Sequence, residues 1–211
     1  TNTREAFKAM REAAQAKDLT DVMRIQSEFL RDAGSRSVAQ ARERLGLPAW
    51  ARVAGYVGRF SSEKRVQQIA ESINWLPQDW HLLLVGDGRD KIEPSDRVHV
   101  LPPTRNVGDI WRACDVAVVA SEAEGYCLSA VEALAAGVPL ASTQVGIMRD
   151  LPTEYVPIEQ PANPQAIAAA IMAAYHLGPS SALARWARTE ASAAKMAERW
   201  AEFLASVASP Q

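Results

Sequence analysis

Short apolar runs alternate with helical stretches between residues 52 and 158, and this alternation constrains the fold most. Runs of strand length cover residues 52–57, 81–85, 98–101, 116–120, 139–143 and 155–158. Helices are expected between them, over residues 63–75, 107–114 and 127–136. Strands that alternate with helices form a parallel sheet with right-handed crossovers. The sequence therefore predicts an α/β fold, in which helices flank one parallel sheet.

Helical segments flank this α/β series on both sides. Before it, apolar spacing and capping residues predict helices over residues 3–16, 20–33 and 36–45. After it, residues 163–172 are amphipathic with Pro164 in the first turn, and the alanine-rich residues 181–207 form a helical tail. We therefore divide the chain into a helical segment, residues 1–35, and an α/β domain, residues 36–211.

Composition excludes several classes of function. The chain has 211 residues, of which 48% are hydrophobic and 23% charged, as in ordinary globular proteins. A formal net charge of −2 gives no electrostatic reason to expect nucleic acid or an anionic membrane as partner. No run approaches the ~18 apolar residues of a transmembrane segment. Two cysteines, Cys114 and Cys127, fit a reducing compartment, so we expect a cytoplasmic location.

Two glutamates, Glu124 and Glu132, lie where the strand over residues 116–120 gives way to a loop and a helix. In an open α/β sheet, ligands bind outside the carboxyl ends of the strands. The unpaired amides at the start of a helix suit a phosphate group. The two carboxylates would repel a phosphate, so they are better suited to hydroxyl groups. Together these features predict a sugar nucleotide as the ligand.

Two cations follow an earlier strand end. Arg59 and Lys64 come after the strand over residues 52–57, where Gly55 and Gly58 let a ligand approach the backbone closely. Arginine can bind a diphosphate through two parallel hydrogen bonds, and lysine adds a mobile point charge. Positive charge at the start of a helix opposes the helix dipole, which favours a ligand as its reason. The alternative is a pair of solvated charges.

Four motifs together resemble a known family. The run Glu124-Gly-Tyr-Cys-Leu-Ser-Ala-Val-Glu132, followed by Ala-Leu-Ala-Ala-Gly-Val-Pro139, resembles the E-x7-E signature of retaining, family-4-like glycosyltransferases. Tyr56-Val-Gly-Arg-Phe-Ser-Ser-Glu-Lys64 is similar to their other donor motif. Leu83-Leu-Val-Gly-Asp-Gly88 and Trp111-Arg-Ala-Cys-Asp-Val116 keep the family's order, over residues 41–203. The resemblance implies a single Rossmann-like sheet, one half of a GT-B fold.

The resemblance also implies roles for particular residues. Arg59 and Lys64 would neutralise the leaving diphosphate, and Glu124 would contact hydroxyls of the transferred sugar, which makes these three the catalytic candidates. Glu132 would accept hydrogen bonds from both ribose hydroxyls. The remaining donor-binding candidates contribute mainly backbone: Gly58, Gly86, Val100, Gly125, Tyr126, Cys127 and Leu128. Three dispersed histidines and no D-x-D motif indicate neither a metal ion nor another cofactor.

The chain departs from the family pattern at several of these positions. Arg65 and Cys127 stand where the family usually has glycine, which leaves less room near the diphosphate. Pro102 also replaces a common glycine and removes an amide donor, so a base contact at Val100 and its absence both fit. The Gly86-Asp-Gly88 run fits a plain turn equally well. His99 is expected to be packed or solvated rather than catalytic.

The expected function follows from these residues and from what precedes them. About 50 residues come before the α/β series, too few for the acceptor domain of the family. We expect the donor-binding domain of a retaining glycosyltransferase, which binds a UDP- or GDP-sugar but transfers little or no hexose alone. Residues 19–30 faintly resemble phasins, helical proteins of polyester storage granules, so the first segment is foreign or rearranged under this interpretation, with a join near residues 34–35.

Two other interpretations stay open. The chain could be a non-enzymatic scaffold that associates into a homo-oligomer through its N-terminal helices. Phe7, Ile25 and Phe29 would otherwise face inward and cover apolar surface. The chain could also be half of a sugar-nucleotide epimerase with a GT-B fold, which would need acid and base residues from a second domain. A glycoside hydrolase is disfavoured, because no pair of carboxyls is placed to face each other across a bond.

Overall fold

The structure is a computed structural model that describes residues 37–149, 151, 155–192, 194–195, 197–199 and 201–202. The chain divides into two compact units, Thr1–Ala49 and Trp50–Gln211. In the first unit residues 37–44 are helical, and Gly46 follows with a left-handed φ of 68°. The helices expected over residues 3–16 and 20–33 lie outside the described residues, as do Phe7, Ile25 and Phe29. The division after residue 35 stays a prediction.

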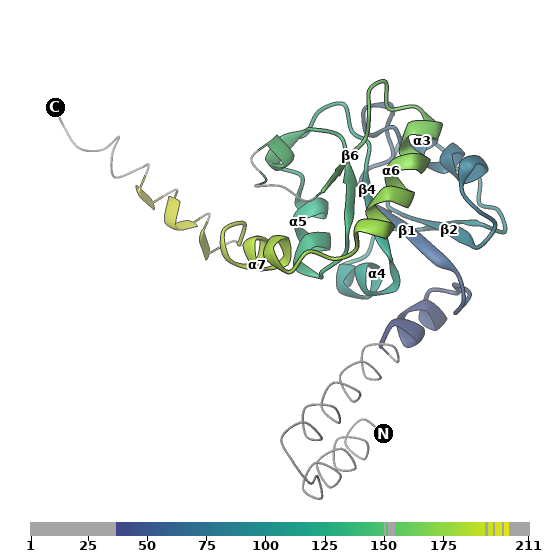
Figure 1. The fold of residues 1–211 in the computed structure, drawn as a ribbon, viewed down its shortest axis with the longest axis horizontal. Coiled ribbons are helices and arrows are strands. Elements are labelled where there is room, and N and C mark those ends of the chain that lie inside the picture. Colours follow the sequence, from purple (N-terminus) through teal and green to yellow (C-terminus); the bar gives the residue numbers. More distant parts are fainter. Residues whose placement is uncertain are drawn as a thin grey trace, which may run out of the picture. The chain divides into compact units, whose positions relative to one another are not determined.

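The second unit contains a six-stranded parallel sheet in the order β3-β2-β1-β4-β5-β6 (Figure 1). This Rossmann-like order confirms the predicted fold class. The strands are β1 (Arg52–Val57), β2 (Trp80–Val85), β3 (Val98–Leu101), β4 (Val116–Val119), β5 (Leu140–Ser142) and β6 (Val156–Pro157). The central strands are almost fully buried because helices cover both faces of the sheet, which explains their uninterrupted apolar sequences.

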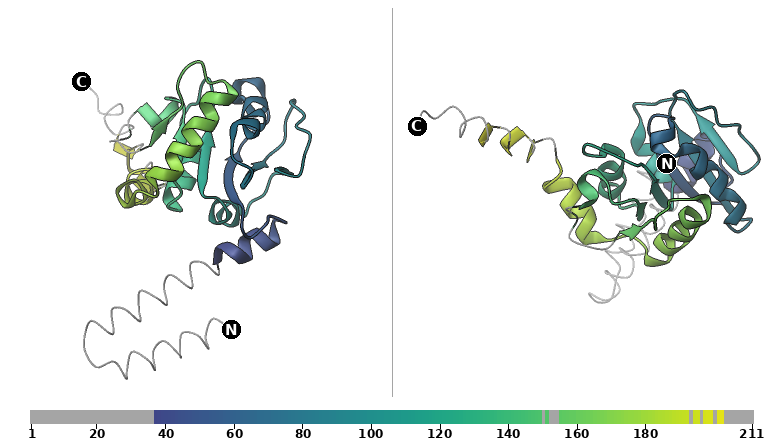
Figure 2. Two further views of the ribbon diagram at one scale, coloured as in Figure 1. Left: turned by 45° about the vertical axis from the view of Figure 1, so that its right-hand side comes forward. Right: turned by 90° about the horizontal axis from the view of Figure 1, so that it is seen from above.

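Helices cover the sheet in two layers. On one face α3 (Val66–Glu71), the 3-10 helix η2 (Ser72–Trp75) and α6 (Pro164–Leu177) pack together (Figures 1 and 2). Their apolar side chains form one core with Tyr56, Leu82, Leu84 and Val118 of the strands. On the other face lie α4 (Val107–Ala113) and α5 (Leu128–Ala135), and α7 (Ser181–Thr189) packs against α5. Alternate strand residues thus serve opposite layers.

The single helix expected over residues 63–75 is broken into three pieces. A 3-10 turn, η1 (Ser62–Lys64), precedes α3, and η2 follows it. The break comes at Arg65, whose φ of 51° and ψ of 35° are left-handed and cannot continue a right-handed helix. Apolar spacing alone does not reveal such a residue, because Val66 and Ile69 are buried as the pattern requires.

Helix ends follow the local sequence. The Asn163 side chain accepts a hydrogen bond from the Ala166 amide at 2.8 Å, and Pro164 opens α6, which continues to Leu177 rather than ending at residue 172. Ser180 caps α7 in the same way through the Leu183 amide. Within the described residues, no single helix has both the length and the apolar character to cross a membrane; α6 and α7 together do, with a turn of 99° between them.

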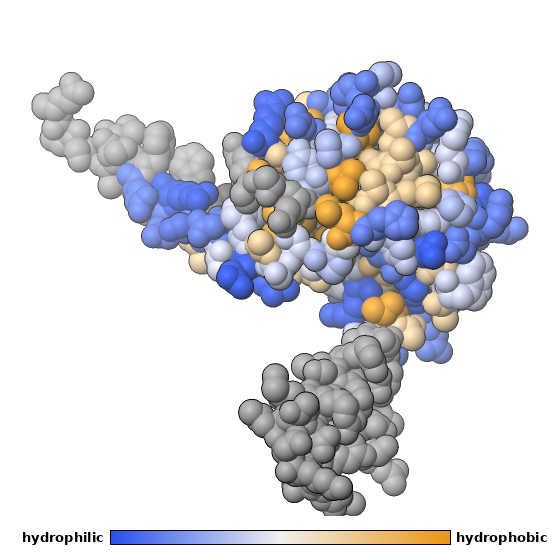
Figure 3. Space-filling model, in the orientation of Figure 1, coloured by the Kyte–Doolittle hydropathy of each residue, from blue (hydrophilic) through white to orange (hydrophobic). Residues whose placement is uncertain are grey.

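The surface of the second unit is mixed in character. Apolar residues gather on the face that α6 covers, and hydrophilic residues surround them (Figure 3). Helix α6 contributes to this face because it is rich in alanine, which is both small and apolar. Four larger apolar side chains are exposed among the described residues: Trp50, Trp75, Leu128 and Leu177. Of these, Leu128 lies at the start of α5, beside the predicted site.

Candidate functional site

The loops that follow β1 and β4 meet at the carboxyl edge of the sheet. These strands are hydrogen-bonded neighbours, yet β2 and β3 continue on one side of them and β5 and β6 on the other. A crevice forms where the strand order reverses in this way, and ligands of open α/β sheets bind there. The loop over residues 58–65 carries both predicted cations, and the loop over residues 120–127 carries Glu124. The fold therefore brings together two motifs about 60 residues apart.

A partly buried ion pair joins the two loops. Lys64 Nζ lies 2.8 Å from Glu124 Oε1 and donates to the Ala123 carbonyl oxygen at 3.1 Å. The Lys64 side chain is 12% exposed and that of Glu124 is 18% exposed, so solvent screens the pair poorly. Ser121 Oγ donates a second hydrogen bond to Glu124 Oε1 at 2.8 Å. The Glu124 carboxylate is thus held in one orientation, toward Lys64.

Arg65 joins the same loops a second time. Its guanidinium donates to the Ala120 carbonyl oxygen at 3.1 Å and lies 3.3 Å from Glu122 Oε1. The Glu122 amide in turn donates to the Glu63 carbonyl oxygen at 2.8 Å. Arg65 departs from the glycine of the family pattern, and the sequence predicts no role for it. Its contacts span more than 50 residues of sequence, so no local pattern could have shown them.

Two residues of the site have a backbone conformation that normally favours glycine. Among the described residues, Arg65 (φ 51°) and Cys127 (φ 70°) are the two non-glycine residues with positive φ. Both are positions where the resembled family usually has glycine. The structure thus gives a physical reason for that glycine, because a side chain in the left-handed region clashes with its own backbone.

Glycines let the loops after β1 and β2 lie directly against each other. A Cβ atom at Gly86 would lie 1.9 Å from the Gly58 carbonyl oxygen, and one at Gly88 would lie 2.0 Å from that of Phe60. Tyr56, at the end of β1, donates its hydroxyl to the Arg59 carbonyl oxygen at 2.8 Å. Burial, followed by the nearby Glu124 charge, raises the pKa of Tyr56, so this hydroxyl stays protonated.

Helix α5 begins in the second loop. Its N-cap residue, Cys127, forms no side-chain capping hydrogen bond, and amides at a helix start that lack a cap can bind an anion. Gly125 and Leu128 are exposed here, and Tyr126 is half-buried. Burial raises the pKa of the Cys127 thiol, and Glu124 adds to the rise, although the Ala130 amide opposes it. A protonated thiol is a poor nucleophile, so Cys127 is a backbone element rather than a reactive group.

Glu132 lies further along α5 and is partly buried. Burial raises the pKa of its carboxyl, and the Trp111 indole opposes part of that rise. The buried indole Nε1 of Trp111 nevertheless has no partner at hydrogen-bonding distance among the described residues. We therefore take the Trp111–Glu132 interaction as a longer electrostatic contact. A half-buried carboxylate with unused acceptor sites suits hydroxyl donors.

Two predicted residues stand apart from the ion pair. Arg59 is exposed, and its backbone carbonyl oxygen accepts the hydrogen bond from the Tyr56 hydroxyl. Val100 is half-buried on β3 and pairs with Leu84 of β2, so two strands separate β3 from β4. Gly58 and Gly86 lie at the ends of β1 and β2, between these positions.

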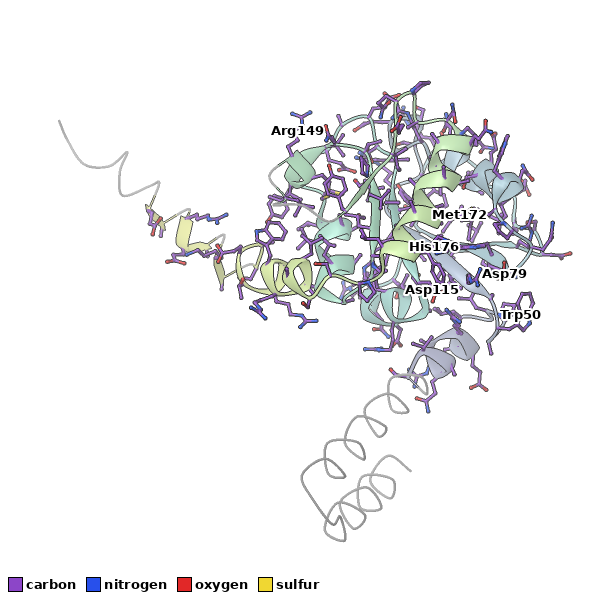
Figure 4. The ribbon with its side chains drawn as sticks, in the orientation of Figure 1. Trp50, Asp79, Asp115, Arg149, Met172 and His176 are labelled. Carbon is purple, nitrogen blue, oxygen red and sulfur yellow. The ribbon has the colours of Figure 1, made fainter. Side chains whose placement is uncertain are left out.

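A polar pocket of about 490 Å³ adjoins the two loops at the ends of β4, β5 and β6. The sequence signal for this pocket is weak: Ser121 and Thr143 each follow one of two neighbouring strands. Arg149, in the 3-10 helix η3 (Gly146–Arg149), lies at the opposite end of the sheet from Asp79 and Asp115 (Figure 4). The polar and charged residues that line this pocket are Arg65, Ser121, Glu122, Thr143, Gln144, Arg149, Glu159 and Gln160.

His99 lies away from this site, as expected for a packed residue. Its Nε2 is 2.9 Å from His81 Nδ1 near the amino ends of β2 and β3. Burial lowers the pKa of both rings, so both are neutral at pH 7. In the part of the chain that the structure describes, no three His, Cys, Asp or Glu side chains are grouped as a metal ion requires.

Comparison with known proteins agrees with this geometry. A family model described as "Glycosyl transferases group 1" matches residues 51–176, and a phasin family model matches residues 1–47. A glycosyltransferase of Bacillus subtilis named for teichuronic acid biosynthesis is 35% identical over 136 residues, which cover 63% of this chain and 35% of that protein. A GDP-mannose-dependent alpha-mannosyltransferase of Mycolicibacterium smegmatis is 33% identical over 107 residues, 47% of this chain and 27% of that one.

Solved structures show the same fold. Anabaena Alr3699/HepE in complex with UDP and glucose superimposes with a TM-score of 0.71 at 20% identity, over 81% of this chain and 52% of that one. The chain spans about a third of the length of the curated relatives it matches. The family match covers more than half of the 211 residues. The N-terminal segment is similar to phasins, and the chain belongs to the group 1 glycosyl transferases with a GT-B-type α/β domain.

Proposed function

We propose that the α/β unit binds the donor of a retaining glycosyl transfer, a UDP- or GDP-sugar. The observation that carries this proposal is the Lys64–Glu124 ion pair, which joins the loops that follow β1 and β4. A diphosphate needs positive charge, and a sugar needs oriented acceptors for its hydroxyls. The pair supplies both within 2.8 Å, at the point where open α/β sheets bind nucleotides.

The diphosphate would lie against Lys64 and the start of α5. When the bond from sugar C1 to the diphosphate oxygen breaks, the electron pair leaves with the diphosphate. Lys64, the exposed Arg59 and the first amides of α5 would offset that charge, which is electrostatic stabilisation by groups already in place. This role needs no metal ion, because positive charge comes from the chain itself.

The two carboxylates would bind the hydroxyls on either side of the diphosphate. Glu124 has one oxygen engaged by Lys64 and Ser121, and its other oxygen can accept from a sugar hydroxyl. Glu132, two turns later, would accept from the two ribose hydroxyls. Gly125 and Tyr126 lie between them in the chain. One protein of similar structure is known in complex with UDP and glucose, and one relative is named as GDP-mannose-dependent. Uridine and guanosine nucleotides are therefore both candidates for the donor.

Transfer by these 211 residues alone would be slow or absent under this proposal. The described residues present the donor side of the reaction. The acceptor hydroxyl, and the group that takes its proton, would come from a second domain that closes over the donor and excludes water. An assay that shows efficient multiple-turnover sugar transfer by the chain alone would contradict this part.

Calorimetric titration tests the donor proposal. We expect saturable binding of UDP and UDP-glucose, or of GDP and GDP-mannose, to the full chain. Lys64→Ala should weaken nucleotide binding by ~1.5–3 kcal/mol, the usual size of a charge-assisted contact. Glu124→Gln should weaken binding of the nucleotide-sugar more than binding of the nucleotide that lacks the sugar. Arg199→Gln is the control, since Arg199 forms an exposed pair with Glu190. Equal affinities in all variants would contradict the assignment.

A second function is favoured by the phasin match over residues 1–47. Phasins are helical proteins, so we propose that this segment mediates self-association of the chain. Under this proposal the full chain is a dimer or higher oligomer by light scattering. A mass equal to that of one chain at every concentration tested would rule it out.

A further inference from the structure

Arg65 is held in a conformation that its side chain makes costly. Its φ of 51° is in the left-handed region, where an L-residue other than glycine is disfavoured. The residue ends η1 and also begins α3: its amide donates to the Ser62 carbonyl oxygen, and its carbonyl accepts from the Ile69 amide at 3.0 Å. Glycine would make the same backbone contacts with less strain. The side chain therefore needs a reason of its own.

The contacts of that side chain supply the reason. Arg65 Nη1 donates to the Ala120 carbonyl oxygen, directly after β4, and Nη2 pairs with the Glu122 carboxylate. The Arg65 side chain is 19% exposed, whereas that of Glu122 is 57% exposed. The hydrogen bond to the Ala120 carbonyl oxygen is therefore the better shielded of the two contacts. A planar guanidinium can hold two acceptors at a fixed spacing, whereas an ammonium group can serve them only as a point charge.

The two acceptors belong to the loop that carries Glu124, and Arg65 itself follows Lys64 directly. A backbone hydrogen bond also joins the two loops: the Glu122 amide donates to the Glu63 carbonyl oxygen. Arg65 thus lies one residue from Lys64 on one side and binds residues two and four positions before Glu124 on the other. Any shift of one loop against the other would change the Lys64–Glu124 distance.

We propose that Arg65 is a positioning residue, which fixes the loop after β1 against the loop after β4 and so sets the spacing between the diphosphate and sugar ends of the donor site. The expected effect of Arg65 on donor binding rests on the proposed function. The contacts of Arg65 with Ala120 and Glu122 do not depend on it, because they are present without a ligand. Because Lys64 holds the diphosphate and Glu124 the sugar, their spacing matters most for a ligand that has both parts. Misplacement of reacting groups by about 1 Å can cost two orders of magnitude.

The test uses Arg65→Gly, Arg65→Lys and the surface control Arg199→Gln in the full chain. The first removes the guanidinium and suits the left-handed backbone, so it should fold. Two quantities are measured: hydrogen exchange of the Glu122 amide without ligand, and the ratio of the dissociation constants of UDP and UDP-glucose, with GDP and GDP-mannose run in parallel.

In Arg65→Gly we expect Glu122 exchange to speed up and the affinity gained from the sugar to fall by about tenfold, the size of one charge-assisted bond. Arg65→Lys should restore part of both effects, and Arg199→Gln should change neither. A general loosening would weaken both ligands equally and leave their ratio unchanged, which would overturn the positioning role. Glu122 exchange at the wild-type rate in Arg65→Gly would overturn the cross-link.

The two proposals fail in different ways. If the wild-type chain binds neither nucleotide nor its sugar conjugate, the proposed function is wrong. Glu122 exchange still decides the Arg65 cross-link in that case, because it is measured without ligand: faster exchange in Arg65→Gly supports the cross-link, and equal exchange contradicts it.

Discussion

Two single residues of the candidate site have strained backbones. Arg65 and Cys127 have left-handed backbones although neither is glycine, and they flank the Lys64–Glu124 pair in the two loops. The sequence showed that both positions depart from the family's glycine. It could not show the strain, because φ at a loop residue is set by contacts with the other loop. Strained conformations of this kind persist where the surrounding structure holds them.

Cys127 allows the strain to be measured. Cys127→Ala and Cys127→Gly both remove the buried thiol, but only glycine fits the left-handed backbone easily. The left-handed cost for an L-residue is ~1–2 kcal/mol, and the entropy cost of glycine is roughly 0.5–1 kcal/mol. We therefore expect Cys127→Gly to unfold at higher urea than Cys127→Ala, by up to about 1 kcal/mol in free energy. An alanine variant more stable than the glycine variant would show that φ is not strained there.

Glu132 makes stability depend on pH. Burial raises the pKa of its carboxyl above the ordinary 4.5, so the folded state takes up its proton more readily than the unfolded state. Ionisation of Glu132 therefore destabilises the folded state as pH rises from about 4.5 through the raised pKa, and the cost persists at pH 7. We expect Glu132→Gln to raise the free energy of unfolding at pH 7, with the gain vanishing near pH 4. Urea denaturation of the variant and the wild-type chain at pH 4 to 7 measures the gain at pH 7 and its loss near pH 4. A variant that is less stable than the wild-type chain at pH 7 would contradict this expectation.

At the scale of elements, much of the fold follows from the sequence. The strands over residues 52–57 and 98–101 have the predicted bounds, because apolar runs between polar residues are a local signal. Helix α3 was predicted as part of one longer helix, since its break depends on Arg65. The last strand, β6, pairs over two residues rather than the expected four. Pairing length depends on the neighbouring strand, which the local sequence does not encode.

At the site, too, local features could be predicted from the sequence and long-range contacts could not. The glutamates and cations could be named from the sequence, since strand ends and glycines mark where ligands bind. The pairing of Lys64 with Glu124 could not be derived, because it requires β4 to lie beside β1. The role of Arg65 was missed for the same reason, because its contacts with Ala120 and Glu122 also cross between the two loops. Ser121 was missed although its hydrogen bond to Glu124 is local. The assignments of site residues to donor groups stay predictions.

The contact between the β1 and β2 loops gives a prediction at this scale. Gly86→Ala would place a Cβ atom 1.9 Å from the Gly58 carbonyl oxygen, at a φ of 154° that side chains rarely adopt. Overpacking and strain should together cost at least about 2 kcal/mol. Gly108→Ala is the matched control, because its Cβ atom would have 3.9 Å of clearance in a helix, where alanine is favoured. The midpoint temperature of thermal unfolding should fall in Gly86→Ala and should stay equal or rise in Gly108→Ala.

At the scale of the whole molecule, the chain joins two kinds of sequence. The phasin match ends at residue 47, the glycosyl transferase match begins at residue 51, and the two compact units divide between Ala49 and Trp50. The sheet and its helices form their own contiguous core within the second unit. That unit therefore has what an independently folding domain needs.

Deletion of residues 1–34 separates the two parts experimentally. The second unit should keep its thermal transition, since the core cluster that α3 and α6 form with the strands contains no residue before Ala54. If the N-terminal segment covers apolar surface or mediates association, the shortened chain should be less soluble or change its oligomeric state by light scattering. A shortened protein that is equally soluble and unchanged in mass would contradict both roles for the segment.

A donor site at the loops after β1 and β4 should be visible by NMR. Amide chemical shifts of the isotope-labelled chain are recorded during titration with UDP-glucose and, separately, GDP-mannose. The account predicts that one of them shifts the amides of residues 58–65 and 121–128 most, with saturation, while those of His81 and His99 at the other end of the sheet stay unchanged. Saturating shifts centred on His81 and His99, or no shifts with either ligand, would contradict it.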